Sequence, residues 1–255
     1  MGSSPPWSRA WVIGGSTGIG RDVALLLARR GVATTVAARS REKLAEVAAE
    51  ATGISTLELD VAEAAATRSK LEAQMDRDGA APDLVVLCAA TWHPMGAKTF
   101  DASKFAQSFD VNVVGIANCL AAVMPAMIAR RKGHIAIVSS VAGYRGLPNA
   151  AAYGPTKAAL INLAESLEPD LRRFGVTLSI VNPGFVDTPM TRVNKFPMPF
   201  ILTSGEAARR IVSGLERRHY EIAFPWQMVA FLKLARIAPN RLFLWYVRRF
   251  ILPGS

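Results

Sequence analysis

Near its beginning the chain reads Ala10-Trp11-Val12-Ile13-Gly14-Gly15-Ser16-Thr17-Gly18-Ile19-Gly20, four apolar residues followed by a glycine-rich turn. A helical pattern comes next, because Val23, Leu26 and Leu27 recur at spacings of three and four until Gly31. A strand, a glycine-rich turn and a helix in this order indicate a dinucleotide site. Glycines let the backbone approach a pyrophosphate, and the first N–H groups of the helix bind it. Taken alone, the stretch also fits an ordinary turn between a strand and a helix.

Apolar runs alternate with helical patterns along the rest of the chain. We predict strands over residues 10–14, 33–38, 55–59, 83–89, 134–139, 176–181 and 220–224, and helices near 18–30, 41–51, 62–77, 103–131, 152–173 and 204–218. Nearly continuous apolar strands are typical of a parallel sheet that is covered on both faces. The sequence therefore predicts an α/β fold, a single doubly wound Rossmann domain over residues 1–255 with a seven-stranded parallel sheet. Thr203 and Glu206 predict a capping box for the helix that begins near Ser204.

Composition narrows the class of protein. The 255 residues are 51% hydrophobic and 20% charged, as in an ordinary globular enzyme. Two cysteines and three histidines offer little material for a disulfide framework or a metal site, and we predict no metal. The net charge is +10, but the basic residues are scattered rather than grouped with aromatics, so we predict no nucleic-acid partner. No signal peptide or uninterrupted span of eighteen apolar residues stands out, and we expect a cytoplasmic protein.

Tyr153 and Lys157 stand four residues apart, and Ser140 precedes the tyrosine by thirteen residues. On a helix, residues four apart share a face, with Cβ atoms about 5–6 Å apart. The lysine cation would favour the phenolate and could lower a phenol pKa of about 10 by roughly 1–3 units. Such a phenol can exchange a proton with an alcohol or carbonyl oxygen, to which Ser140 could donate a second hydrogen bond. Because proline is tolerated only in the first turn of a helix, Pro155 predicts that the helix begins near Tyr153 or bends there.

These motifs, in this order, resemble those of the short-chain dehydrogenase/reductase family from Gly14 to about Thr188. The family's glycine motif falls on Gly14, Gly18 and Gly20, its catalytic asparagine, serine, tyrosine and lysine on Asn112, Ser140, Tyr153 and Lys157, and its P-G motif on Pro183-Gly184. The resemblance implies that Tyr153 is the acid or base and that Ser140 orients the substrate oxygen. It also implies that Lys157 lowers the pKa of the tyrosine and holds the nicotinamide ribose, while Asn112 holds a water that links Lys157 to solvent.

The resemblance further implies a nicotinamide cofactor. Its implied contacts are Gly14, Ser16, Thr17, Gly18, Ile19, Gly20, Arg39, Asp60, Val61, Ala89, Ala90, Tyr153, Lys157, Pro183, Gly184, Val186 and Thr188. Two departures stand out: Ile13 replaces the family's threonine, and Leu87-Cys88-Ala89-Ala90 replaces its N-N-A-G segment. Because side-chain hydrogen bonds are lost at both places, we expect a less rigid cofactor loop that still binds.

The segment after the second strand indicates which cofactor is preferred. Ala38 stands where an NAD enzyme would carry an acidic residue for the ribose 2′-hydroxyl, and Arg39 follows it. A guanidinium group suits the oxygens of a 2′-phosphate, so we predict NADP. Two simpler interpretations stay open: Arg39 could cap a surface turn, and Asp60 could cap the next helix rather than contact adenine.

Residues about 189–203 correspond to the family's substrate lid and are rich in Met and Phe. Trp92, Met95 and Tyr144 lie in other loops that we expect to face the same cleft. An apolar pocket predicts a hydrophobic ketone or alcohol as substrate, of lipid, steroid or acyl type, unless part of the lid is core packing. The predicted function is thus an NADP(H)-dependent oxidoreductase. The alternative is a non-catalytic NADP-binding regulatory or scaffold protein of the same fold, which should lack Ser140, Tyr153 or Lys157.

The chain changes character over about 226–255, an apolar and basic C-terminal extension. Helical patterns cover 227–236 and 240–252, with aromatic side chains beside Arg and Lys. Three interpretations fit such short helices: peripheral contact with a membrane, packing in a homodimer or homotetramer, and closure of the core.

Overall fold

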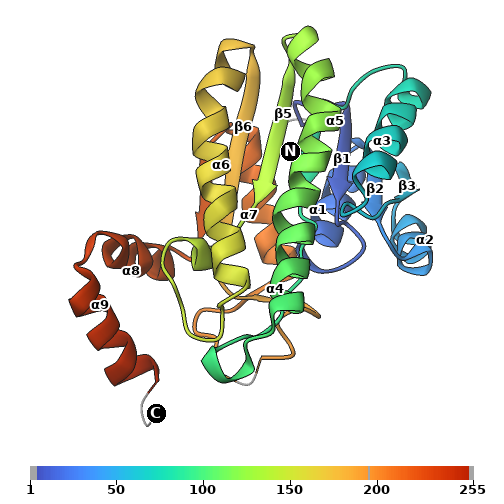
Figure 1. Ribbon diagram of the computed structural model, residues 1–255. Helices are drawn as coiled ribbons and strands as arrows, with labels where there is room; N and C mark the ends of the chain where they lie inside the picture. The colour runs from blue at the N-terminus through green and yellow to red at the C-terminus, as the bar shows by residue number, and fades with distance from the viewer. Residues whose placement is uncertain (1–4, 195, 253–255) are drawn as a thin grey trace.

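Seven parallel strands form the central sheet of the computed structural model, which describes residues 5–194 and 196–252 (Figure 1). Their order is β3-β2-β1-β4-β5-β6-β9, and it confirms the predicted doubly wound α/β fold. The bounds are β1 Arg9–Ile13, β2 Ala33–Ala38, β3 Ile54–Glu58, β4 Leu84–Leu87, β5 Gly133–Val138, β6 Val176–Pro183 and β9 Glu221–Phe224, while β7 Val186–Asp187 pairs with β8 Leu202–Thr203 in a separate sheet. Residue 195 of the predicted lid and residues 253–255 of the C-terminal extension lie outside the described residues.

Helices cover both faces of the sheet. They are α1 Gly18–Arg29, α2 Arg41–Glu50, α3 Ala64–Asp78, α4 Ala102–Phe109, α5 Gly115–Ala129, α6 Tyr153–Arg173, α7 Ser204–Glu216, α8 Trp226–Ile237 and α9 Asn240–Tyr246. Successive residues of β1 serve opposite faces, as the pleat of a strand requires. Trp11 joins a core with Ile116 of α5 and Leu160 of α6, whereas Val12 joins the other core with Val23 of α1. This two-sided burial explains why the strands are apolar throughout.

Two local expectations are met where a ring or a side chain constrains the backbone. Helix α6 begins at Tyr153, so Pro155 lies in the first turn, where its missing N–H costs nothing. The Thr203 hydroxyl accepts from the Glu206 N–H, and the Glu206 carboxylate accepts from the Thr203 N–H, which completes the predicted capping box.

The long helix predicted over 103–131 is not regular. It consists of α4, a π-helical turn Asp110–Val114 and α5. This helix, Ala102–Ala129, is also apolar and long enough to cross a membrane by length and composition, with a mean hydropathy of 1.9 in its most apolar window. However, it packs against the sheet and α3 as part of the main core, and 44% of that window is buried inside the protein. It is therefore a core helix of the α/β fold.

The order of the strands defines where a ligand can bind. The chain passes from β1 outward through β2 to β3 and then returns to β4 on the other side of β1. At such a reversal the loops after the two adjacent strands run to opposite faces and leave a crevice at their carboxyl ends. The glycine-rich turn follows β1 and the 88–92 segment follows β4, so both border this crevice.

Candidate active site

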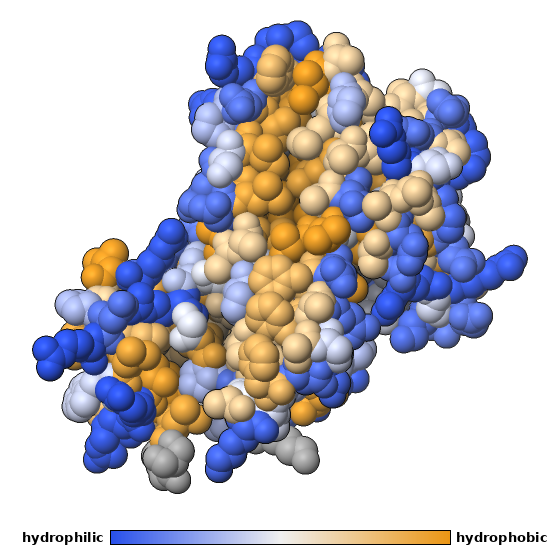
Figure 2. Space-filling model, viewed as in Figure 1, coloured by the Kyte–Doolittle hydropathy of each residue, from blue (hydrophilic) through white to orange (hydrophobic). Residues whose placement is uncertain are grey.

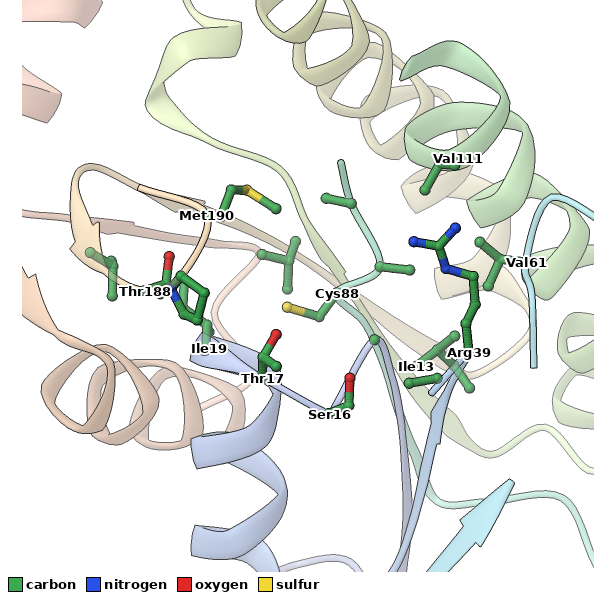
Figure 3. Close-up of a pocket in the computed structure, with 18 of the residues that line it drawn as sticks. Ile13, Ser16, Thr17, Ile19, Arg39, Val61, Cys88, Val111, Thr188 and Met190 are labelled. Carbon is green, nitrogen blue, oxygen red and sulfur yellow. The ribbon is translucent and has the colours of Figure 1, made fainter. Parts of the chain in front are cut away.

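A cleft of about 600 Å³ occupies this crevice (Figure 3). Most of the predicted site residues line it: Gly14, Ser16, Thr17, Gly18, Ile19, Arg39, Asp60, Val61, Ala89, Ala90, Ser140, Tyr153, Lys157, Pro183, Gly184, Val186 and Thr188. Gly20 and Asn112 lie outside the lining. Cys88 and Met190 also line the cleft, from the segment after β4 and from the predicted lid. Lys43 and Val111 line it too, although no sequence pattern placed either residue in the site.

The glycine turn is closed by contacts that only glycine permits. A Cβ atom at Gly14, where φ is +84°, would lie 2.4 Å from the Ala89 nitrogen. A Cβ atom at Gly20 would lie 2.4 Å from the Gly14 carbonyl oxygen, so Gly20 shapes the turn from behind the cleft. Thr17, the N-cap of α1, makes no side-chain cap hydrogen bond, and the first turn of α1 holds no acidic residue. These first N–H groups are therefore oriented for an external anion, which fits a cofactor pyrophosphate.

The far end of the cleft is basic. Arg39 follows β2 and its side chain is 69% exposed; one of its terminal nitrogens lies 3.9 Å from an Asp60 carboxylate oxygen. Figure 3 shows the guanidinium beside Val61, at the edge of the cleft. Lys43 in the first turn of α2 lines the same end, below the Ser40 hydroxyl that caps this helix. A phosphate group thus fits at this end of the cleft, between the cations of Arg39 and Lys43, the Ser40 hydroxyl and the N-terminus of α2.

Asp60 does two things in this arrangement. One carboxylate oxygen accepts a hydrogen bond from the Ala62 N–H at 3.1 Å, and the backbone carbonyl accepts one from the Thr67 hydroxyl. The residue therefore organises the turn before α3. It is not the cap that the simpler interpretation expected, because the N-cap of α3 is Glu63. It also lines the cleft, so a contact with a nucleotide stays compatible with the geometry.

Lys157 is a buried cation in the floor of the cleft. Its side chain is only 1% exposed, and its Nζ donates to the Val138 carbonyl oxygen at 3.0 Å. The same Nζ lies 5.3 Å from the centre of the Tyr153 ring, as the four-residue spacing predicted. Burial lowers the pKa of Lys157 to about 8, because the low-dielectric surroundings disfavour the charged form. Lys157 is therefore mostly protonated at neutral pH but close to titration.

The pKa of Tyr153 corrects one expectation. We expected Lys157 to lower it, but burial raises it above its ordinary value of 10, and only a hydrogen bond with Ser140 opposes this increase. The reason is distance and direction: the ammonium lies over the ring and is engaged by a carbonyl oxygen, so it solvates the phenolate poorly. The Tyr153 hydroxyl therefore carries its proton at neutral pH.

Ser140 lies directly after β5 and is held from two sides. Its hydroxyl donates to the Pro183 carbonyl oxygen at 3.2 Å and accepts from the Ala142 N–H at 3.1 Å. The first bond joins the ends of β5 and β6, and the second caps a short 3-10 turn over 141–143. These bonds fix the hydroxyl in place. Ser140 and Tyr153 line the same cleft, so that both oxygens can meet the same atom of a substrate.

Asn112 sits in the π-helical turn and is completely buried. Its side-chain carbonyl accepts from the Thr91 N–H at 2.7 Å, and its amide group donates to the Thr91 carbonyl at 3.0 Å and to the Thr156 hydroxyl at 3.1 Å. Asn112 thus ties the segment after β4 to the start of α6. The predicted link between Asn112, a water and Lys157 stays a prediction.

Of the three loop residues that we expected to face the cleft, only Trp92 contacts Tyr153. The Trp92 ring packs edge-on against the Tyr153 ring, with centroids 5.1 Å apart, and its Nε1 donates to the Asn194 side chain at 3.0 Å. Trp92 therefore connects the tyrosine to the 189–203 segment. Met95 and Tyr144 are buried away from the cleft lining, because Met95 packs in a bridge to Ala150 and the Tyr144 hydroxyl donates to a carboxylate.

Comparison with known proteins agrees with this geometry. The family model described as short chain dehydrogenase matches residues 8–196. An uncharacterized oxidoreductase of Myxococcus xanthus (strain DK1622) is 40% identical over 238 residues, which cover 92% of this chain and 94% of that protein. A solved structure named ribose-5-phosphate isomerase, from Brucella melitensis 16M, is 30% identical with a TM-score of 0.80, covering 87% of this chain and 93% of that one. A short-chain dehydrogenase from Streptomyces avermitilis shares the fold, with 22% identity and a TM-score of 0.83 over 97% and 99% of the two chains.

Proposed function

Because the chain belongs to the short-chain dehydrogenase family of oxidoreductases, which use nicotinamide cofactors, we propose that it interconverts a ketone and a secondary alcohol with NADP(H). Tyr153 is the acid or base, and the substrate is hydrophobic, of lipid, steroid or acyl type. The observation that carries this proposal is the convergence of Ser140, Tyr153 and Lys157 on one cleft with the glycine turn.

The part played by the chain is to hold the substrate oxygen and to move one proton. When bound, NADP(H) supplies or accepts the hydride at the substrate carbon. In reduction, the Tyr153 hydroxyl donates its proton to the carbonyl oxygen while Ser140 orients that oxygen. Because the pKa of Tyr153 is raised, its hydroxyl still carries the proton at neutral pH. Lys157 is mostly protonated below pH 8, and its ammonium lies 5.3 Å from the centre of the Tyr153 ring.

Preference for NADP over NAD rests on the basic end of the cleft. Ala38 leaves room beside β2 without negative charge, and Arg39 and Lys43 offer cations to a 2′-phosphate.

Arg39→Ala should weaken NADPH binding roughly 10–100-fold, the range of a charge-assisted contact, and leave NADH binding nearly unchanged. Fluorescence titration with both cofactors measures this. Arg41→Ala, a neighbour outside the cleft lining, is the matched control. Equal loss for both cofactors would contradict the preference.

A hydrophobic substrate is supported by the apolar side chains around Tyr153. Trp92 lies against the tyrosine ring, and Pro189 and Met190 line the cleft near Thr188. Phe185 contacts Phe196 of the lid, with ring centroids 6.0 Å apart. Such a wall gains free energy from burying alkyl surface and offers few partners to a hydroxylated sugar.

The deciding experiment is a substrate panel followed by NADPH absorbance. Aliphatic, steroid and 3-oxoacyl ketones form the hydrophobic arm, and keto sugars form the polar arm. Turnover should favour the hydrophobic arm, and Tyr153→Phe should lower kcat by about 10²–10⁴-fold with NADPH binding retained. Equal turnover by Tyr153→Phe would overturn the assignment of the tyrosine, and preference for the polar arm would overturn the substrate class.

A non-catalytic NADP-binding regulatory or scaffold protein is the alternative from another class. Loss of Ser140, Tyr153 or Lys157 would favour it, and all three are present and adjacent. NADPH binding without turnover of any ketone or alcohol in the panel would favour this alternative.

We also propose that the protein forms a homodimer or homotetramer in the cytoplasm. An apolar band runs over α5 and α6 (Figure 2). Residues 111–129 contain no charged residue, and their exposed positions are Val114, Ala117, Ala121, Pro125 and Ala129. A flat surface of small uncharged side chains suits a second copy of the same helix. Cys88 and Cys119 are both free thiols, as in a reducing compartment.

A further inference from the structure

The last two helices form an arm that packs weakly on itself. This C-terminal arm, residues 226–252, consists of α8, α9 and the π-helical turn Val247–Ile251, and it projects from the body of the protein (Figure 1). Among its described residues, its own core contains only Ala235, Phe243 and Val247, while Leu232, Met228 and Val229 of α8 pack against the main core. Three side chains are too few to bury the apolar surface of two helices, so most of that surface faces outward.

The arm exposes large apolar side chains at an unusual density. Of the sixteen large hydrophobic side chains exposed in the described part of the chain, ten belong to the arm: Trp226, Phe231, Leu234, Ile237, Leu242, Leu244, Trp245, Phe250, Ile251 and Leu252. Ile237 is 80% exposed and Trp226 is 73% exposed. Contiguous apolar surface of this kind marks a site of contact with a partner or a membrane.

The charge of the arm has one sign. Residues 226–255 contain five basic residues, Lys233, Arg236, Arg241, Arg248 and Arg249, and no Asp or Glu. Within the described residues, no carboxylate forms an ion pair with the last three. Orange and blue atoms accordingly alternate over the arm in Figure 2. These arginines are free to meet an anionic partner.

Contacts at the base of the arm hold it in place. Lys233 binds the Glu221 carboxylate of β9, Arg236 lies 4.0 Å from the Glu165 carboxylate of α6, and the Arg145 guanidinium donates to the Asn240 side chain at 2.6 Å. The two arm cations nearest the body are thus engaged with it. The remaining arginines and the exposed aromatics belong to the outer part.

We propose that this arm docks onto the surface of an anionic lipid bilayer. Trp and Tyr side chains prefer the headgroup region, and arginines extend to lipid phosphates while their alkyl parts cover apolar surface. The sign of the charge argues against a second copy on the same surface. Two arms would bring together six arginines, Arg241, Arg248 and Arg249 of each copy, that have no carboxylate partner within the described residues. Docking of the arm does not depend on the reaction at the cleft.

Flotation of the full-length protein with large unilamellar vesicles tests the proposal. Vesicles of phosphatidylcholine alone are compared with vesicles that contain 30% phosphatidylglycerol, at low salt and at high salt. We expect flotation with the anionic vesicles at low salt, at least a tenfold weaker partition at high salt, and little binding to neutral vesicles. No flotation with anionic vesicles at low salt would overturn the proposal.

Variants separate the arm from the general charge of +10. Arg248→Glu with Arg249→Glu should abolish flotation, and Trp245→Ala should weaken it. Arg172→Glu with Arg173→Glu, an adjacent exposed pair at the end of α6, makes the same charge change and should float like the wild type; circular dichroism verifies that each variant is folded. Equal loss in both pairs would overturn the role of the arm. So would a dimer, measured by light scattering, that Trp245→Ala dissociates, because a second copy would then occupy the surface.

Discussion

The buried charge of Lys157 lowers the free energy of unfolding at neutral pH. Unfolded lysine titrates at an ordinary pKa of 10.5, whereas burial lowers the pKa in the folded protein to about 8. Below pH 8 Lys157 is protonated in both the folded and the unfolded protein, and the buried charge costs the folded state about 3 kcal/mol. Between pH 8 and 10.5 the unfolded protein binds more protons than the folded protein, so the free energy of unfolding rises with pH. Lys157→Met should therefore raise the free energy of unfolding at pH 7 by about 2 kcal/mol, after loss of the hydrogen bond to Val138.

Urea denaturation of the wild type and Lys157→Met at pH 7 and pH 9.5 measures this effect. The stability difference should shrink toward zero at the higher pH, while the variant loses turnover. A methionine variant that is less stable at pH 7, or a difference independent of pH, would contradict the buried charge.

The buried histidine His134 makes the free energy of unfolding fall at acidic pH. It lies in β5 with 4% of its surface exposed, its Nε2 is 2.9 Å from the Ser179 hydroxyl, and its Nδ1 has no partner. Burial and the Arg218 cation lower its pKa from 6.5 to about 4. As pH falls from 6.5 to 4, the unfolded chain takes up the proton first, so folding loses about 3 kcal/mol. His134→Gln should remove most of this loss.

Thermal unfolding at pH 7.5 and pH 4.5 is the measurement for His134. The control is His93→Gln, at a partly exposed histidine, which should retain the acid sensitivity of the wild type. If His134→Gln and the wild type lose the same stability between the two pH values, the neutral buried histidine is not responsible.

Single side chains also mark the limit of what the sequence could predict. The spacing of Tyr153 and Lys157 placed the ammonium beside the ring, because a helix fixes that distance. The direction of the pKa shift of Tyr153 depended instead on burial by residues distant in sequence, and spacing says nothing about burial. Lys43 was missed for a similar reason: only the tertiary placement of α2 brings it to the cleft.

Among the elements, the π-helical turn Asp110–Val114 connects two parts of the site. Through Asn112 it holds both backbone groups of Thr91, just beyond Ala89 and Ala90, and the Thr156 hydroxyl at the start of α6. Asn112→Ala should lower the free energy of unfolding by about 2 kcal/mol, since it leaves these groups without a partner. Because α6 carries Tyr153, kcat should fall more than NADPH affinity does.

Urea denaturation and steady-state kinetics of Asn112→Ala test this connection. Asn162→Ala, an exposed position on α6, should leave stability within about 0.5 kcal/mol of the wild type. An Asn112→Ala protein with unchanged kcat would show that the turn supports the fold but does not position the tyrosine.

The elements themselves were largely predictable. All seven strands of the main sheet fall within two residues of the expected positions, because apolar runs between glycine and proline signals leave few alternatives. Pro155 predicted that the helix begins near Tyr153 or bends there, and α6 begins at Tyr153. The π-helical turn was not predictable, since one extra residue in a helical turn hardly disturbs the apolar pattern on either side. Its function is to turn Asn112 inward.

Across the whole molecule, two separate apolar surfaces differ in charge. The α5 surface is uncharged over residues 111–129, whereas the C-terminal arm has five cations and no anion. This separation suits two different partners: a second copy on α5 and an anionic surface on the arm. The sequence alone left these alternatives open for the arm, because its aromatic and basic composition fits both a membrane and a subunit interface.

A charge placed on the exposed face of α5 should disrupt the proposed subunit interface. Ala121 is exposed in the middle of α5, so glutamate is tolerated there in a monomer but would place two carboxylates near each other in a symmetric interface. Burying such unpaired charges is costly, and Ala121→Glu should shift a dimer or tetramer to smaller species by light scattering. Ala45→Glu, an exposed alanine on α2, should leave the mass unchanged. An assembly that persists in Ala121→Glu, or a wild type that is already monomeric at micromolar concentration, would remove α5 as the interface.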